Sequence, residues 1–261
     1  MNPRTMRYLL LIGLLSCRIF LNPAIAEEAS AEQVKEWIHD LKTEPADSRY
    51  RLISQICKMA APHAAHPPTE SSNRVDLLPV LEAAIDGDDP KVSYQAICTL
   101  CYMNCKDAFP ILERELRSER QVQRQMACMG IEWLAAMPEV RARAIADLEA
   151  ARDRAGEGLG VRLAATSALL GAGVPQEPKV FLEALRDPRG NEAQAAKHLA
   201  DMGRKDTIEL MIVRLRTAVP SSDYWLAKSL NQLTGADLGK DAKEWQEWLD
   251  AHRAELPEQL N

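Results

Sequence analysis

Three cysteines in one short stretch are the residues whose spacing most suggests chemistry. Cys98, Cys101 and Cys105 stand at i, i+3 and i+7, so a helix would place their thiols along one stripe. Thiolates bind zinc and iron–sulfur clusters, but zinc sites usually pair two Cys-x-x-Cys knuckles, and there is no second knuckle. Attached haem needs a histidine after the second cysteine, where Tyr102 stands. We therefore predict no metal and no cofactor.

A disulfide is the next interpretation of these cysteines. Cysteines occur at 17, 57, 98, 101, 105 and 128, and removal of an export signal would leave an odd number, five. In an oxidising compartment neighbouring helices can be joined, and the candidates are Cys57, Cys98, Cys101 and Cys128, with Cys57 bonded to Cys98 or Cys101. Plain packing of cysteine as a small hydrophobe is the third interpretation, and the helix geometry favours it.

The familiar catalytic motifs do not occur in this chain. The sequence has no Gly-x-Ser-x-Gly, no phosphate loop and no His-Glu-x-x-His. Gly156-x-Gly158-x-Gly160 follows no predicted strand, so we interpret it as a loop between helices. His63 and His66 lie in a proline-rich segment without further ligands. We predict no catalytic residues and no enzymatic activity.

The elements that carry these residues are predicted to be helices throughout. Hydrophobic residues make up 46% of the 261 residues but aromatic residues only 5%, and no stretch alternates strictly between apolar and polar residues. The clearest unit has an apolar helix over 77–85, an acidic turn, and a second helix from Pro90. Asp89 is expected to cap that helix, and Pro90 suits its first turn. Similar second helices recur from positions 48, 92, 122, 161, 191 and 222, which predicts a stack of helix pairs.

The segment Val161–Gly171, with Val-Arg, Ala-Ala and Ala-Leu-Leu-Gly, resembles the HEAT repeat, and the resemblance extends over roughly residues 32–254. It implies an all-α fold, a right-handed α–α superhelix of about six HEAT-like helix pairs with a C-terminal capping helix. A loop insertion is expected at about 61–74. The cap is expected at about 234–254, where Trp245 and Trp248 resemble the closing segment of exported bacterial HEAT-repeat proteins.

The resemblance also implies a function, because HEAT-like stacks bind peptides or proteins on the concave face formed by their second helices. The candidate contacts stand two residues after the start of a second helix: Tyr50, Tyr94, Arg124 and Tyr224. We predict a non-enzymatic interaction scaffold. The alternative is a HEAT-like enzyme or a cofactor- or metal-binding protein, lyase-like or using Cys98, Cys101 and Cys105.

The N-terminus predicts export. Arg4 and Arg7 precede a short apolar run, and Ala24-Ile25-Ala26 offers a signal-peptidase site, so residues 1–26 form the predicted signal peptide and 27–261 the repeat domain. Cleavage would leave 29 basic against 38 acidic residues, which argues against a nucleic-acid partner. The run is too short for a transmembrane helix. We expect a periplasmic or secreted protein, or alternatively a lipoprotein anchored through Cys17.

Overall fold

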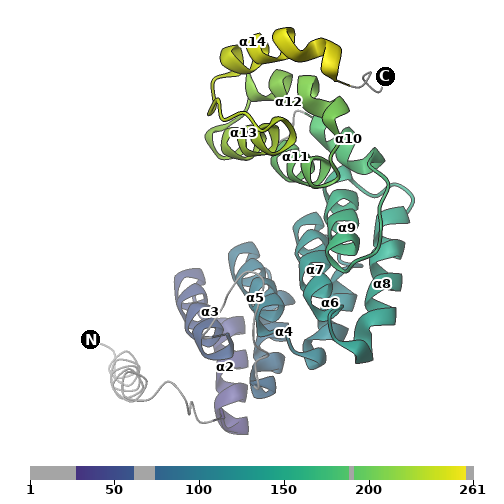
Figure 1. The fold of residues 1–261 in the computed structure, drawn as a ribbon. Helices are drawn as coiled ribbons and strands as arrows, with labels where there is room; N and C mark the ends of the chain where they lie inside the picture. The colour runs from purple at the N-terminus through teal and green to yellow at the C-terminus, as the bar shows by residue number, and fades with distance from the viewer. Residues whose placement is uncertain (1–27, 62–73, 188–190, 257–261) are drawn as a thin grey trace. The chain divides into compact units, whose positions relative to one another are not determined.

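The computed structural model describes residues 28–61, 74–187 and 191–256, and all regular secondary structure in these ranges is helical (Figure 1). The all-α prediction is therefore confirmed. The chain divides into two compact units, the first ending at Ala108 and the second beginning at Phe109, and each is described by itself. The predicted signal peptide and Cys17 lie outside the described residues. None of the helices within those ranges is long and apolar enough to span a bilayer.

Unit 1 contains two helix pairs, each made of a first and a second helix. Its elements are α2 (Ala31–Thr43), α3 (Ala46–Ala60), η1 (Val75–Leu77), α4 (Leu78–Ile85), α5 (Pro90–Met103) and η2 (Lys106–Ala108). First helix α2 packs on α4, and second helix α3 packs on α5, as in an α-solenoid. The Asp89 side chain accepts hydrogen bonds from the N–H groups of Lys91 and Val92, so the predicted N-cap is confirmed. The expected insertion falls between α3 and η1, and its residues 62–73, with His63 and His66, are outside the described ranges.

Unit 2 contains four further pairs and a closing helix. Its elements are α6 (Phe109–Glu115), α7 (Gln121–Leu134), α8 (Pro138–Asp153), α9 (Leu159–Gly171), α10 (Lys179–Arg186), α11 (Glu192–Asp201), η3 (Lys205–Thr207), α12 (Ile208–Leu215), α13 (Pro220–Thr234), α14 (Ala242–His252) and η4 (Arg253–Glu255). Second helices pack on each other, α7 on α9 and α11 on α13. With unit 1 this makes six pairs within the described residues. The superhelical handedness of the whole stack stays a prediction.

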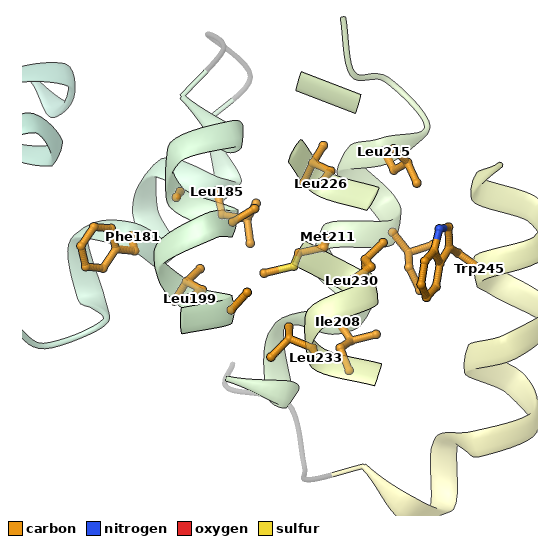
Figure 2. Close-up of a cluster of buried hydrophobic side chains, with 14 of the residues drawn as sticks. Phe181, Leu185, Leu199, Ile208, Met211, Leu215, Leu226, Leu230, Leu233 and Trp245 are labelled. Atoms are coloured by element: carbon orange, nitrogen blue, oxygen red, sulfur yellow. The ribbon is translucent and has the colours of Figure 1, made fainter. Parts of the chain in front are cut away.

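The last pair is closed by α14, as the tryptophan spacing predicts. Trp245 is fully buried and joins Leu249 in the hydrophobic core that α10 to α13 form (Figure 2). Its indole N–H donates to the carbonyl oxygen of Gly239 at 2.9 Å. Gly235 ends α13 with a φ of 77°, and Asp241 caps α14 by accepting from the N–H of Lys243. The core edge of the sixth pair is thereby covered.

Burial corrects the predicted alignment of one repeat. In α5 the buried positions include 92, 96, 97, 100 and 103. The residues that match them in α7 are Gln123, Ala127, Cys128, Ile131 and Leu134, all buried, whereas Val122 is exposed. The repeat position assigned to Val122 therefore belongs to Gln123, whose buried amide takes the place that Val92 and Val161 hold in α5 and α9. Arg124 then aligns with Arg49 and Arg162 and not with the tyrosines.

Candidate functional site

The realigned arginines share one structural role. Each stands one residue after the aligned position near the start of a second helix, and each reaches a carboxylate of the next helix pair. Arg49 on α3 binds Asp88 at 2.6 Å, Arg124 on α7 binds Glu157 at 2.8 Å, and Arg162 on α9 binds Glu183 at 2.9 Å. We call these three ion pairs the repeat latches. They join consecutive pairs within each unit.

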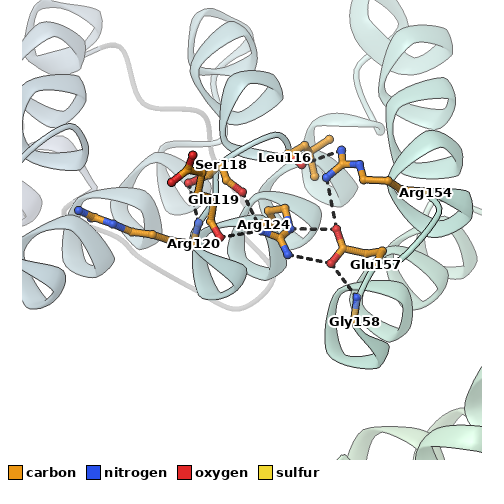
Figure 3. Close-up of polar contacts among 8 residues, drawn as sticks. All are labelled: Leu116, Ser118, Glu119, Arg120, Arg124, Arg154, Glu157 and Gly158. Atoms are coloured by element: carbon orange, nitrogen blue, oxygen red, sulfur yellow. Dashed lines mark hydrogen bonds and ion pairs between the residues drawn. The ribbon is translucent and has the colours of Figure 1, made fainter.

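The Arg124–Glu157 latch is the most buried of the three. The Glu157 side chain is only 2% exposed, and Arg124 bonds it with two parallel hydrogen bonds, from Nε (2.9 Å) and Nη2 (2.8 Å). Arg154 adds a third contact at 3.3 Å, and Figure 3 shows both guanidinium groups converging on this one carboxylate. Arg124 also donates to the carbonyl oxygens of Ser118 and Glu119. The Arg124 guanidinium is thus hydrogen-bonded within unit 2, although the sequence analysis predicted it to be a partner contact.

Glu157 also contacts the glycine-rich segment before α9. The carboxylate accepts a hydrogen bond from the N–H of Gly158, the N-cap of α9, at 2.9 Å. Burial alone would raise its pKa, but the hydrogen bonds from Arg124 and Gly158 outweigh burial and lower the pKa. A helix N-terminus beside two arginines is a place where anions bind, and here the chain supplies the anion itself. Gly156 and Gly158 lie in the predicted loop between two helices, whereas Gly160 lies in the first turn of α9. The loop carries a structural contact.

A cleft of about 800 Å³ opens next to this loop. It is lined by the end of α8, by the α8–α9 loop, by α9 and by the segment that leads into α10. The arginines among its walls already have partners: Arg152 bonds Asp153 and Gln176, and Arg154 bonds Glu157. The cleft therefore offers few unused donors.

The predicted tyrosine contacts are exposed, as a binding role requires. Tyr50, Tyr94 and Tyr224 are 44%, 47% and 51% exposed, on α3, α5 and α13 respectively. Tyr50 and Tyr94 occupy equivalent positions of two second helices that contact each other within unit 1. The equivalent Leu163 is buried, because α10 packs across α9 and encloses it. The tyrosine position is thus a surface position in some pairs only.

The five described cysteines are free thiols, and none of them is in a disulfide. Cys57, Cys101, Cys105 and Cys128 are buried, as plain packing predicts, and Cys98 is half-buried. Cys57 on α3 faces α5, where it donates to the carbonyl oxygen of Gln95 (3.7 Å) and accepts from the Thr99 hydroxyl (2.6 Å). Bonding of Cys57 to Cys98 or Cys101 stays a prediction. Within the described ranges no three His, Cys, Asp or Glu side chains are grouped so that they could hold a metal ion.

Burial makes these thiols weak acids. It raises the pKa of Cys57, Cys98 and Cys105, and it raises that of Cys128 to about 12. The Tyr94 hydroxyl hydrogen-bonds to Cys98 and partly offsets the effect of burial there. Because the thiolate is the nucleophile and the metal ligand, these cysteines are poorly reactive near neutral pH.

Glu132 is a titratable residue that no sequence motif indicates. Burial raises the pKa of Glu132 on α7 to about 7, although Lys197 opposes the shift. Its carboxylate lies over Gly171 of α9, where an added Cβ atom would clash with Glu132 Oε1. The only sequence signal was a glycine at the end of a helix, which is far more often a C-cap than a space for a neighbouring side chain.

Comparison with known proteins adds little to this geometry. No family model matches the chain, and no curated protein does. The helices themselves therefore identify the fold. The chain is a helical-repeat protein. A solved structure that matches the chain is the complex of CpcE and CpcF of phycocyanin lyase from Nostoc sp. PCC7120, with 17% identity, a TM-score of 0.39, and coverage of 88% of this chain and 98% of that one.

This match contradicts the prediction that the chain is not an enzyme, because the similar structure belongs to a lyase. The absence of familiar catalytic motifs was the basis of that prediction, and motifs of that kind describe other folds. At this identity and TM-score the likeness transfers no substrate and no catalytic residue to this chain.

Proposed function

We propose that this protein binds a peptide or protein partner through the exposed side chains of its second helices, with Tyr50 and Tyr94 as central contacts. The observation that supports the proposal is their exposure: two large aromatic side chains at equivalent positions of adjoining helices are nearly half accessible. Tyrosine provides a large contact area and a hydroxyl group while losing few rotamers on binding. Such residues carry much of the energy of protein interfaces.

The core of unit 1 does not depend on these two rings. Ile53 and Ile56 of α3 and Ile97 and Leu100 of α5 are fully buried and supply the packing between the helices. Tyr50 and Tyr94 can therefore be changed without opening a cavity, and binding can be separated from stability.

The proposal also includes export. The residues before Glu27 have the order of a secretory signal, with Arg4 and Arg7, an apolar run and Ala24-Ile25-Ala26. We therefore place the function outside the cytoplasm. The N-terminal residue of the protein isolated from its own host tests this: Glu27 agrees with cleavage, a lipidated Cys17 moves the protein to a membrane anchor, and Met1 contradicts export.

A displayed peptide library tests the binding proposal. Peptides selected on the chain 27–261 would have their dissociation constants measured against Tyr50→Ala, Tyr94→Ala and the control Val213→Ala. Val213 is 47% exposed but lies on α12, a first helix, so it matches Tyr94 in exposure and is not on a second helix. We expect Tyr94→Ala to weaken binding at least tenfold (about 1.4 kcal/mol) and Val213→Ala to leave it unchanged. Equal effects of both variants, or no selected peptide, would contradict the proposal.

Thiol chemistry on the same face is a second candidate, in line with an enzymatic or cofactor-binding function. Cys98 is the most accessible of the described cysteines, and it stands four residues after Tyr94 on α5, one helical turn from the proposed contact. A ligand bound beside Tyr94 would contact the Cys98 thiol. Mass spectrometry of the protein from its own host tests this candidate: an adduct that Cys98→Ser removes supports it, and an unmodified chain contradicts it.

A further inference from the structure

An aromatic pair on α13 stands apart from the core that surrounds it. Tyr224 and Trp225 are consecutive residues, 51% and 40% exposed, and their rings meet edge to face with centroids 5.4 Å apart and planes at 80°. An exposed tryptophan is costly to leave in water and is a typical anchor residue of protein interfaces. Because the two rings already pack on each other, little further ordering is needed for binding.

The fold does not need these rings. Helix α13 packs into unit 2 through Leu226, Leu230 and Leu233, all buried in the core of Figure 2. Trp225 is adjacent to Leu226 in sequence, but it is not among the residues of that core. The exposure of the pair therefore has a cause other than packing.

Two lysines lie over the faces of the rings. Lys228 Nζ is 5.1 Å from the centre of the Trp225 ring, and Lys240 Nζ is 6.0 Å from that of Tyr224. Lys240 is also held by Asp223 at 2.8 Å. Lys228 is exposed and forms no ion pair with any residue in the described ranges. The ammonium groups of Lys228 and Lys240 thus have one neighbouring carboxylate among the described residues, that of Asp223, so the surface is locally positive. The whole chain has a net charge of −6.

We infer that Tyr224, Trp225, Lys228 and Lys240 form a recognition site for a partner segment that carries carboxylates next to an apolar or aromatic side chain. The apolar group would cover the rings, and the carboxylates would pair with the two ammonium groups. The acidic remainder of the chain repels such a segment, so charge complementarity directs it to this surface. The inference rests on the proposed function and adds the chemistry of the partner.

A competitive selection tests this site. A displayed peptide library is selected on the chain 27–261 in the presence of excess soluble Trp225→Ala protein, so that only peptides that need Trp225 are retained. We expect the retained peptides to be enriched in Asp and Glu next to apolar residues. Their affinity should fall at least tenfold with Lys228→Glu, and it should also fall as salt is raised. Lys243→Glu is the matched control, since the Lys243 side chain is 85% exposed on α14.

The other outcomes overturn the inference. Retention of no peptide, retained peptides without acidic enrichment, or equal losses with Lys228→Glu and Lys243→Glu would each do so. Concentration-dependent dimerisation that Trp225→Ala abolishes would assign the surface to a second copy of the chain instead. Peptides that need Tyr94 but not Trp225 would leave the proposed function standing, whereas peptides that need Trp225 alone would contradict only the role of Tyr94.

Discussion

The guanidinium group of Arg124 bonds both carboxylate oxygens of Glu157, at 2.9 and 2.8 Å, and so joins α7 to the loop before α9. Arg49 with Asp88 and Arg162 with Glu183 repeat this connection elsewhere in the chain. The three latches differ in burial. They therefore allow the effect of solvent on one repeated contact to be measured within one protein.

Arg124→Ala should destabilise the protein by roughly 2–4 kcal/mol, because the buried Glu157 carboxylate would keep only the Gly158 N–H and the longer contact from Arg154. Urea denaturation measures the loss. Arg162→Ala is the control: the side chains of its ion pair with Glu183 are 27% and 45% exposed, and its removal should cost less than about 1 kcal/mol. Equal losses would show that burial of the latch is unimportant.

Glu132 should make stability depend on pH. Its folded pKa of about 7 exceeds its ordinary value of 4.5, so the folded state retains a proton that the unfolded chain releases. Its contribution to the free energy of unfolding is fully present below about pH 4.5 and is lost as the pH rises to about 7. Glu132→Gln should therefore be more stable than the wild type by roughly 1–2 kcal/mol at about pH 8, after allowance for partial exposure, and equal to it at about pH 4.

The Glu132 prediction is measured as the difference between variant and wild type in urea denaturation at the two pH values, which removes the contribution of groups common to both. Gly171→Ala provides a structural check, since a Cβ atom there would displace the carboxylate. That variant should lose the same pH dependence. A difference that does not change with pH would contradict the raised pKa of Glu132.

Trp245→Ala should cost about 3–5 kcal/mol, because it removes a fully buried side chain from the end of the core. Trp225→Ala, which removes the exposed ring of α13, should change stability by no more than about 0.5 kcal/mol. The comparison uses one residue type in two environments. A small loss at Trp245 would mean that α14 does not cap the sixth pair.

The cysteines should react with iodoacetamide in an order set by burial. Cys98 should be alkylated first, and Cys128, fully buried with a pKa of about 12, only when the protein unfolds. Peptide mapping after timed alkylation measures the order. The predicted disulfide would give another result in protein from an oxidising compartment. Cys57 would then resist alkylation until the protein is reduced, and reduction would add the mass of two hydrogens.

Much of the fold was predictable because helical spacing and turn chemistry are local. Asp89 and Trp245 perform the cap and core roles that the sequence predicts for them. The alignment of α7 was not predictable in the same way. A buried glutamine, Gln123, replaces the expected apolar residue, and a hydrophobic pattern selects the neighbouring valine.

The candidate site was less predictable because exposure depends on the neighbouring pair. Tyr94 and Leu163 stand at the same repeat position, yet one is at the surface and the other is enclosed by α10. The role of Arg124 depends on Glu157, which is 33 residues away. No spacing rule links two residues across a repeat boundary of variable length.

The proposed binding surface is tested most directly by site-specific photocrosslinking in the host cell. The photoreactive residue p-benzoylphenylalanine would replace Tyr94 in one variant and Val213 in another, and crosslinked species would be identified by mass spectrometry. We expect one discrete partner crosslinked from position 94 and absent from position 213. No crosslink at position 94, or the same species from both positions, would contradict recognition through the second helices.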